Sequence, residues 1–232
     1  IIMSRDIKLD FDELVGFFSN YSLKDVFKDK TLLAKVSLIH KRYYSFMCLV
    51  YCLQHLPSEN MDNNAMLRLK ESSSDLGTSM FLIINGAYKP ANLMMRSCIE
   101  NFIKSIGCLI DVSILEEKSV FKVIDTAGKH PVVVTNYSFY ETLKAEYSSL
   151  CSHVHTATEK EMTQMKALNA FPTVDQNKVA PLSNSIDKIV KSMIYITISL
   201  YSNIFFSFAS EYREKVLVSL TAAQKASLHL PE

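Results

Sequence analysis

Two segments, separated by about fifty residues, hold the side chains best suited to acid–base or phosphate chemistry. The first, ANLMMRSCIENFIKSIG, carries three charged residues at intervals of four: Arg96, Glu100 and Lys104. The second, YSSLCSHVHTATE, carries two of the six histidines: His153 and His155. A guanidinium binds phosphate or carboxylate groups through its planar fork, and an imidazole titrates near neutral pH and transfers protons. Together these residue types predict a site for an anionic substrate.

The charges of the first segment share one narrow face of a predicted helix. At 100° per residue, the four charged residues between 88 and 110 fall within less than about a quarter-turn: Lys89, Arg96, Glu100 and Lys104. Apolar and small residues take the rest of the circumference, so we expect this helix to be covered on most sides. In the polar window, Glu100 would hold Arg96 toward a phosphate or carboxylate. The alternative is a solvated seam of four-apart ion pairs.

The two histidines lie near the end of a helix predicted over about 137–154. On that helix His155 lies at one edge of the apolar face, and His153 lies near the opposite side. The two rings therefore diverge, and no further ligands with metal-like spacing lie nearby, so we predict neither a metal nor a cofactor. His155 is either a packing residue or the proton-transfer group. The candidate substrate contacts around it are Lys104, Tyr147, Ser152 and His153.

The pattern that must position these residues is helical almost throughout. Glycine is scarce, and apolar residues recur at three and four. We predict one all-α domain over 1–232, a bundle with long central helices. The helices are expected at about 10–19, 31–55, 60–84, 90–110, 113–127, 137–154 and 184–217. Two interruptions are predicted: a short β segment near 131–135, in GKHPVVVTN, and a long loop over about 168–183, which contains two prolines.

Composition limits the classes of function. The 232 residues are 48% apolar with a net charge of +1, so a core is available but a global field for nucleic acid is not. Five cysteines, an odd number in helical patterns, indicate small buried apolar residues in a reducing compartment. With no basic region followed by an apolar run at the start, we expect a cytoplasmic protein.

Two further segments allow a second interpretation. The stretch 192–210 has no charge and is close to the length of a membrane span, but its small polar residues form one stripe, which favours a central bundle helix. The segment HKRYYSF, 40–46, resembles a small nucleic-acid patch. At helical spacing, however, Tyr43, Phe46 and Met47 are expected in the core, with Lys41 and Arg42 outside.

The two chemical segments together resemble bacterial helical proteins of the HEPN and abortive-infection type. Those families pair an Arg-Ser-x-x-Glu helix, here RSCIE at 96–100, with a later Tyr-x-x-Leu-Ser-x-x-x-His helix end. YSSLCSHVH at 147–155 resembles that helix end, with Cys151 in place of the serine. The resemblance covers about residues 80–160. It implies a dimeric helical bundle of a defence or stress system, and in many members a metal-independent ribonuclease.

The nuclease motif of that family is an arginine followed four to six residues later by histidine, and this chain has no such pair. The resemblance therefore implies a composite site from two helices. Arg96 would stabilise charge on the phosphate, His155 would transfer the proton and Glu100 would hold the arginine. RNA and a second copy or partner protein are the expected partners. The alternatives are a non-catalytic interaction module, in which the same residues form a buried polar network, and a membrane-associated effector using 192–210.

Overall fold

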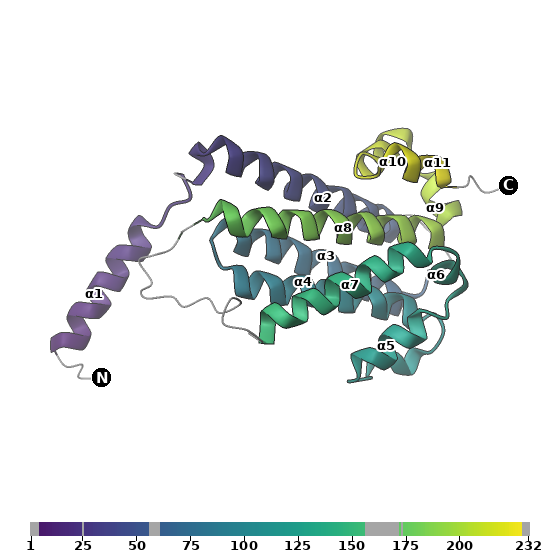
Figure 1. Cartoon of the computed structure of the whole chain (residues 1–232), viewed down its shortest axis with the longest axis horizontal. Helices are drawn as coiled ribbons and strands as arrows, with labels where there is room; N and C mark the ends of the chain where they lie inside the picture. Colours follow the sequence, from purple (N-terminus) through teal and green to yellow (C-terminus); the bar gives the residue numbers. More distant parts are fainter. Residues whose placement is uncertain (1–4, 25, 56–60, 156–171, 173, 229–232) are drawn as a thin grey trace.

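The computed structural model describes residues 5–24, 26–55, 61–155, 172 and 174–228, and for 5–7, 10 and 153–155 it describes the backbone alone. Within these residues every regular element is helical, which confirms the all-α class. The five longest helices of the bundle pack against one another (Figure 1): α2 (Lys30–His55), α3 (Asn63–Ile84), α4 (Tyr88–Gly107), α7 (Tyr137–His155) and α8 (Gln176–Leu200).

The remaining helices are shorter or lie at the ends of the bundle. They are α1 (Arg5–Asn20), α5 (Val120–Ala127), α6 (Pro131–Thr135), α9 (Ser202–Ser207), α10 (Ser210–Leu217) and α11 (Ala222–Ser227), with 3-10 turns η1 (Val26–Lys28) and η2 (Val112–Leu115). Figure 1 shows α1 pointing away from the other helices. The predicted helix over 113–127 is thus two elements, η2 and α5, because the residues from Glu116 to Ser119 are not helical.

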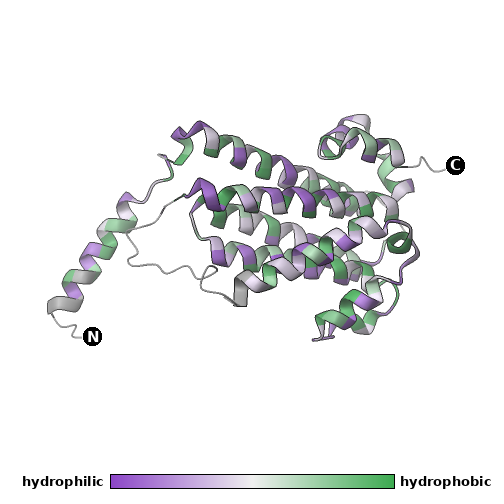
Figure 2. Ribbon diagram, viewed as in Figure 1, coloured by the Kyte–Doolittle hydropathy of each residue, from purple (hydrophilic) through white to green (hydrophobic). Residues whose placement is uncertain are grey.

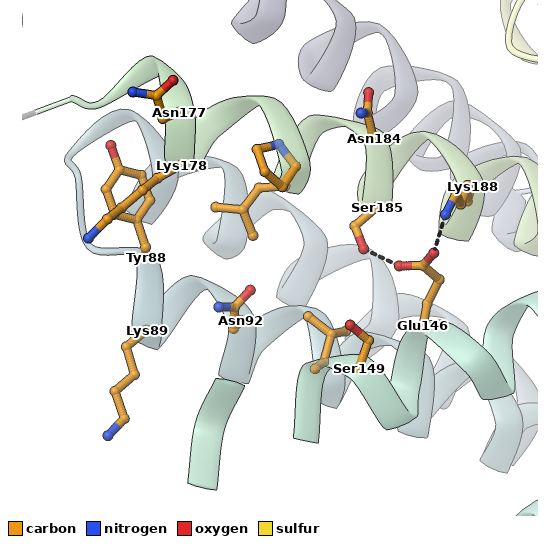
Figure 3. Close-up of a pocket in the computed structure, with 13 residues that line it drawn as sticks. Tyr88, Lys89, Asn92, Glu146, Ser149, Asn177, Lys178, Asn184, Ser185 and Lys188 are labelled. Atoms are coloured by element: carbon orange, nitrogen blue, oxygen red, sulfur yellow. Dashed lines mark hydrogen bonds and ion pairs between the residues drawn. The ribbon is translucent and has the colours of Figure 1, made fainter. Parts of the chain in front are cut away.

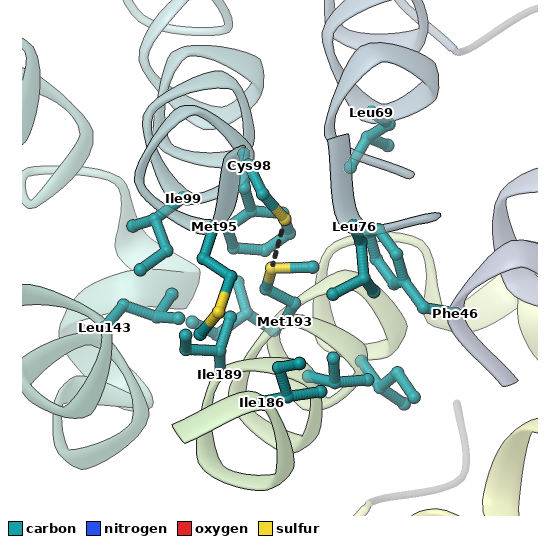
Figure 4. Packing of buried hydrophobic residues seen from close by; sticks show 14 of the residues in the cluster. Phe46, Leu69, Leu76, Met95, Cys98, Ile99, Leu143, Ile186, Ile189 and Met193 are labelled. Carbon is teal, nitrogen blue, oxygen red and sulfur yellow. Dashed lines mark hydrogen bonds between the residues drawn. The ribbon is translucent and has the colours of Figure 1, made fainter. Parts of the chain in front are cut away.

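Helix α4 lies at the centre of the packing. It contacts α3, α5, α7 and α8, and its apolar face is completely buried. Figure 4 shows Met95, Cys98 and Ile99 of α4 meeting residues of α3, α7 and α8. The small flank is buried too: Cys98 is 0% exposed and Ser105 is 3% exposed. The prediction that this helix is covered on most sides is therefore confirmed.

The turn between α3 and α4 follows from its sequence, NGAYKP. Gly86 adopts φ 78°, a backbone conformation that favours glycine, and Ala87 N donates to Leu82 O at 2.8 Å. Pro90 then occupies the first turn of α4, where a missing N–H leaves no hydrogen bond broken. This turn sets α3 and α4 side by side.

The predicted β segment at 131–135 is wrong, because these residues form helix α6. Three consecutive valines favour a strand by propensity, but the described chain offers no strand for them to pair with. Instead Pro131 occupies the first helical position, and His130 caps the helix, with its Nδ1 accepting from Val132 N at 3.3 Å. Local capping therefore outweighs the β preference of the valines.

The predicted loop over 168–183 is wrong in its second half. Residues 176–183 form the first turns of α8, which Asp175 caps by accepting from Asn177 N. Residues 168–171 and 173 lie outside the described residues. Pro181 lies within α8 on an exposed side, and its missing N–H leaves the carbonyl of Asn177 without its usual intrahelical donor.

The long final helix predicted to reach 217 is also interrupted. Helix α8 ends at Leu200, and the extended backbone of Phe208 separates α9 from α10. The breaks turn the chain back over α2, where Ser219 Oγ donates to Ser45 Oγ at 2.7 Å. The stretch 192–210 is therefore not one helix. No helix of the described residues is both long enough and apolar enough to cross a membrane.

Arg42 lies inside the bundle, which corrects its predicted place outside. It is 7% exposed, and its Nε and Nη2 donate to Asp187 Oδ1 of α8 at 2.6 and 2.5 Å. Lys191 Nζ donates to Asp187 Oδ2 at 2.6 Å. The Asp187 carboxylate thus joins α2 to α8, and Arg42 is not available to a nucleic acid.

This ion-pair network yields a stability prediction. Burial would raise the pKa of Asp187, but hydrogen bonds from Lys191 and Arg42 outweigh burial and lower it. We expect Asp187→Asn to reduce the free energy of unfolding by about 1–3 kcal/mol, because Arg42 loses its counter-charge. The loss should be constant above about pH 5 and should shrink as pH falls below the ordinary carboxyl pKa of 3.8. Urea unfolding over this pH range measures it.

The matched control is Glu211→Gln, which breaks an exposed ion pair with Lys215 in α10. We expect that variant to change stability by less than about 0.5 kcal/mol. Equal effects of the two substitutions would contradict a structural role for Asp187.

Candidate functional site

Arg96 is fixed at the seam where α4 packs against α7. Its Nε donates to Tyr147 Oη at 3.1 Å, and its Cζ lies 5.5 Å from the centre of the Tyr147 ring. The terminal guanidinium nitrogens make no hydrogen bond to the described part of the chain and are not among its fully buried unpartnered atoms. The side chain is therefore a half-buried cation held in one place with donors to spare.

The electrostatics of this pair keep both groups in their ordinary charge states. The hydrogen bond that Arg96 donates to Tyr147 raises the pKa of Arg96, against the effect of burial. Burial raises the pKa of Tyr147, although Arg96 opposes this. Tyr147 is thus a neutral phenol that accepts from Arg96, which leaves its own O–H as a donor.

Glu100 and Lys104 lie further along the same window of α4. Their charged groups are 3.8 Å apart, and the Lys104 side chain is only 13% exposed. Arg96 is held by the hydrogen bond that it donates to Tyr147, whereas Glu100 is paired with Lys104. The narrow polar window predicted for α4 therefore holds one ion pair and one separately supported arginine.

The histidine end of α7 is helical through His155. The side chains of His153 and His155 lie outside the described residues. Ser152 Oγ donates to Ser149 O at 2.7 Å, so it is engaged with the backbone of its own helix. Position 155 follows Tyr147 by two turns, about 12 Å along the axis at 1.5 Å per residue. A ligand that used both Arg96 and His155 would have to span that rise.

A pocket of about 480 Å³ lies beside this seam, where α4 and α8 begin. It is lined by polar residues of α4, α7 and α8 (Figure 3), among them Lys89, Asn92, Glu146, Ser149, Asn177 and Lys178. Its volume is within the range of small-molecule sites. Arg96, Glu100, Lys104, Tyr147 and Ser152 are not among its lining residues.

Among the described residues that line the pocket, the one carboxylate is already satisfied. Glu146 is 9% exposed and accepts hydrogen bonds from Ser185 Oγ and from Lys188 Nζ, the latter at 2.8 Å. Glu146 in turn raises the pKa of Lys188. This cluster fixes α7 against α8 and leaves Lys89 and Lys178 as the pocket's other cations.

The sequence interpretation missed this pocket because it treated the start of α8 as a loop. Once 176–188 is a helix, spacings of seven, four and three place its polar residues on one face: Asn177, Asn184, Ser185 and Lys188. The sequence pattern places Glu146 on the side of α7 opposite the apolar face. It does not indicate that α8 packs over that side.

Among the described residues, no three His, Cys, Asp or Glu side chains gather as metal ligands. Comparison of the chain with protein-family models, with curated proteins and with solved structures finds no match. The site must therefore be interpreted from its own geometry.

The Arg96–Tyr147 contact can be tested directly. Tyr147→Phe keeps the ring but removes the acceptor of Arg96 Nε, so we expect a loss of about 0.5–1.5 kcal/mol in stability. In NMR spectra, the Arg96 Nε–H signal should exchange slowly with solvent in the wild type and rapidly in the variant. The Nε–H signal of Arg213, a half-buried arginine of α10, serves as the internal control. An unchanged Arg96 signal would contradict the contact.

Proposed function

We propose that this chain is a HEPN-like helical protein of a bacterial defence or stress system that acts on RNA. One observation carries the proposal: Arg96 is held by Tyr147 at a half-buried seam with its terminal nitrogens uncommitted. A cation fixed in this way binds a phosphate oxygen without first having to be ordered. The all-helical bundle supports the proposal at the level of fold.

The chemistry follows from the residue types. Arg96 would bind a backbone phosphate, and the free O–H of Tyr147 would donate a second hydrogen bond. Cleavage without a metal needs a group that transfers a proton near neutral pH, and His155 is the candidate on α7. The rise of about 12 Å between Tyr147 and position 155 fits a substrate that extends along α7 better than a single compact group.

RNA binding should depend on Arg96 through charge. For single-stranded RNA, each phosphate neutralised contributes about 0.7 to the slope of log affinity against log salt. We expect Arg96→Ala to weaken binding about tenfold and to reduce that slope by about 0.7. Fluorescence anisotropy with a labelled oligoribonucleotide at several salt concentrations measures both quantities. Arg213→Ala, in α10, is the matched control, and equal slopes for the two variants would refute the proposed phosphate contact.

The ribonuclease step has its own test. Cellular RNA is incubated with the wild type, with Arg96→Ala and with His155→Ala, all in the presence of a chelator. We expect cleavage by the wild type alone. RNA profiles identical to a control without protein would exclude ribonuclease activity. RNA binding would then be tested separately by the dependence of affinity on salt concentration.

A second candidate function is supported by α1, which lies outside the bundle. Its large apolar residues are about half exposed, with Phe11 at 50% and Phe18 at 61%, and Figure 2 shows hydrophobic residues along the helix. The apolar positions Ile7, Phe11, Leu14 and Phe18 recur at four and three, the spacing of a helix–helix seam. Such a seam fits the same helix of a second copy, so α1 would serve a non-catalytic role in dimer formation.

This role predicts that the oligomeric state depends on α1. The double substitution Phe11→Ser and Phe18→Ser should convert a dimer to a monomer, because each substitution removes apolar area that the interface would bury. Size-exclusion chromatography with light scattering measures the oligomeric state. Phe121→Ser is the control, since Phe121 is 83% exposed on α5. A monomeric wild type, or a variant that stays dimeric, would exclude α1 as the interface.

A further inference from the structure

The pocket between α4, α7 and α8 holds two lysines that have no carboxylate partner among the described residues. Lys89 and Lys178 line it from the first turns of α4 and α8, and neither forms an ion pair within the described part of the chain. Figure 3 shows Lys178 extending alongside Tyr88 at the end where α8 begins, and Lys89 extending from the start of α4 away from α8. Lys188, in contrast, is neutralised by Glu146. The pocket therefore has a cationic end and a neutral end.

Asn92 gives independent evidence that this pocket binds a polar group. Its side chain is 8% exposed, its Oδ1 is fully buried, and its carboxamide makes no hydrogen bond to the described residues. Buried polar groups are almost always paired, because an unpaired one lowers the stability of the free protein. A carboxamide has both hydrogen-bond donors and an acceptor, so a polar ligand in the pocket would form the hydrogen bonds that Asn92 lacks.

The backbone at the cationic end adds further groups. Ala87 provides no side-chain cap for α4, so the first N–H groups of that helix lack a side-chain acceptor. The positive end of the α4 dipole lies at this same end of the pocket. Pro181 deprives the carbonyl of Asn177 of its usual donor, and both residues line the pocket. The cationic end thus has charge and donors for an anion, and the wall of α8 has an acceptor for a hydroxyl or amine.

The remaining wall is apolar, with Leu150 and Leu182 among the lining residues. A free inorganic anion would leave that wall and the carbonyl of Asn177 unused. We infer that the pocket binds a phosphate monoester, either a nucleotide or a sugar phosphate, with its phosphate on Lys89 and Lys178 and its polar organic part against Asn92 and α8. The site does not include Arg96 and is independent of the proposed RNA contact.

Calorimetric titration of the full chain tests this inference. The probes are nucleoside 5′-monophosphates, ribose 5-phosphate, adenosine and inorganic phosphate. We expect a phosphate monoester to bind at least about tenfold more tightly than adenosine or inorganic phosphate. If nucleotides bind and ribose 5-phosphate does not, the ligand is a nucleotide. If both bind equally, the ligand class is the sugar phosphates. Both outcomes support the monoester site.

Variants separate a ligand site from a structural pocket. Lys178→Glu should weaken binding by tenfold or more, whereas Lys70→Glu, an exposed lysine of α3, should leave it unchanged. Asn92→Leu removes the unpaired amide, so it should weaken binding about tenfold while the melting temperature of the free protein stays the same or rises by roughly 2–4 °C. A purely structural Asn92 would give the opposite sign of the melting shift.

Three results would overturn the inference. The first is the absence of binding for every phosphate ester at about 1 mM. The second is equal binding of adenosine and its monophosphate. The third is tighter binding of a 5′-phosphorylated oligoribonucleotide than of any mononucleotide, with the same loss in Lys178→Glu, since the pocket would then be part of an RNA path. Loss of RNA binding in Arg96→Ala leaves this inference intact. Likewise, loss of monoester binding in Lys178→Glu leaves the proposed RNA contact of Arg96 intact.

Discussion

The enclosure of α4 on nearly every side is the constraint on which the rest of this structure depends. Helices α3, α5, α7 and α8 all contact it, and its buried positions range from Tyr88 to Gly107. A helix enclosed in this way has room for charge only along one strip. The charged residues of α4 are confined to that strip because a charge elsewhere would be buried without a partner. Arg96 is therefore held at a seam between helices, where Tyr147 supports it.

The pocket is a consequence of the same enclosure at the end of the bundle where α4 and α8 begin. There the apolar packing stops, and Lys89, Asn92 and Lys178 replace it. The contrast between two neighbouring buried polar groups is informative. Glu146 has its hydrogen bonds satisfied by Ser185 and Lys188, as expected of a structural residue. Asn92 has none within the described chain, so its carboxamide is free to bind a ligand in the pocket.

Buried polar contacts also fix how the outer helices lie on the core. Asp187 receives Arg42 from α2 and Lys191 from its own helix. On the other side, Asn101 of α4 donates to Asp75 at 3.0 Å and accepts from Arg68 at 3.1 Å. Apolar contacts alone would tolerate a helix sliding past its neighbour, but these directional contacts are made in one register only.

The sequence by itself determined the helical class, the main helices from 30 to 155 and the enclosed character of α4, because these follow from periodicity and from local signals such as the NGAYKP turn. The apolar face of α7 was also predictable, and Tyr140, Leu143, Tyr147 and Leu150 are all buried. Only the tertiary structure decided that Val132–Val134 are helical, that α8 begins at Gln176 and ends at Leu200, and that Arg42 lies inside. For Arg42 the long-range partner Asp187 decided the outcome, whereas for the valines the lack of a neighbouring strand left the decision to local capping. The pocket belongs to the same group, since its residues come from three helices whose approach no local pattern encodes.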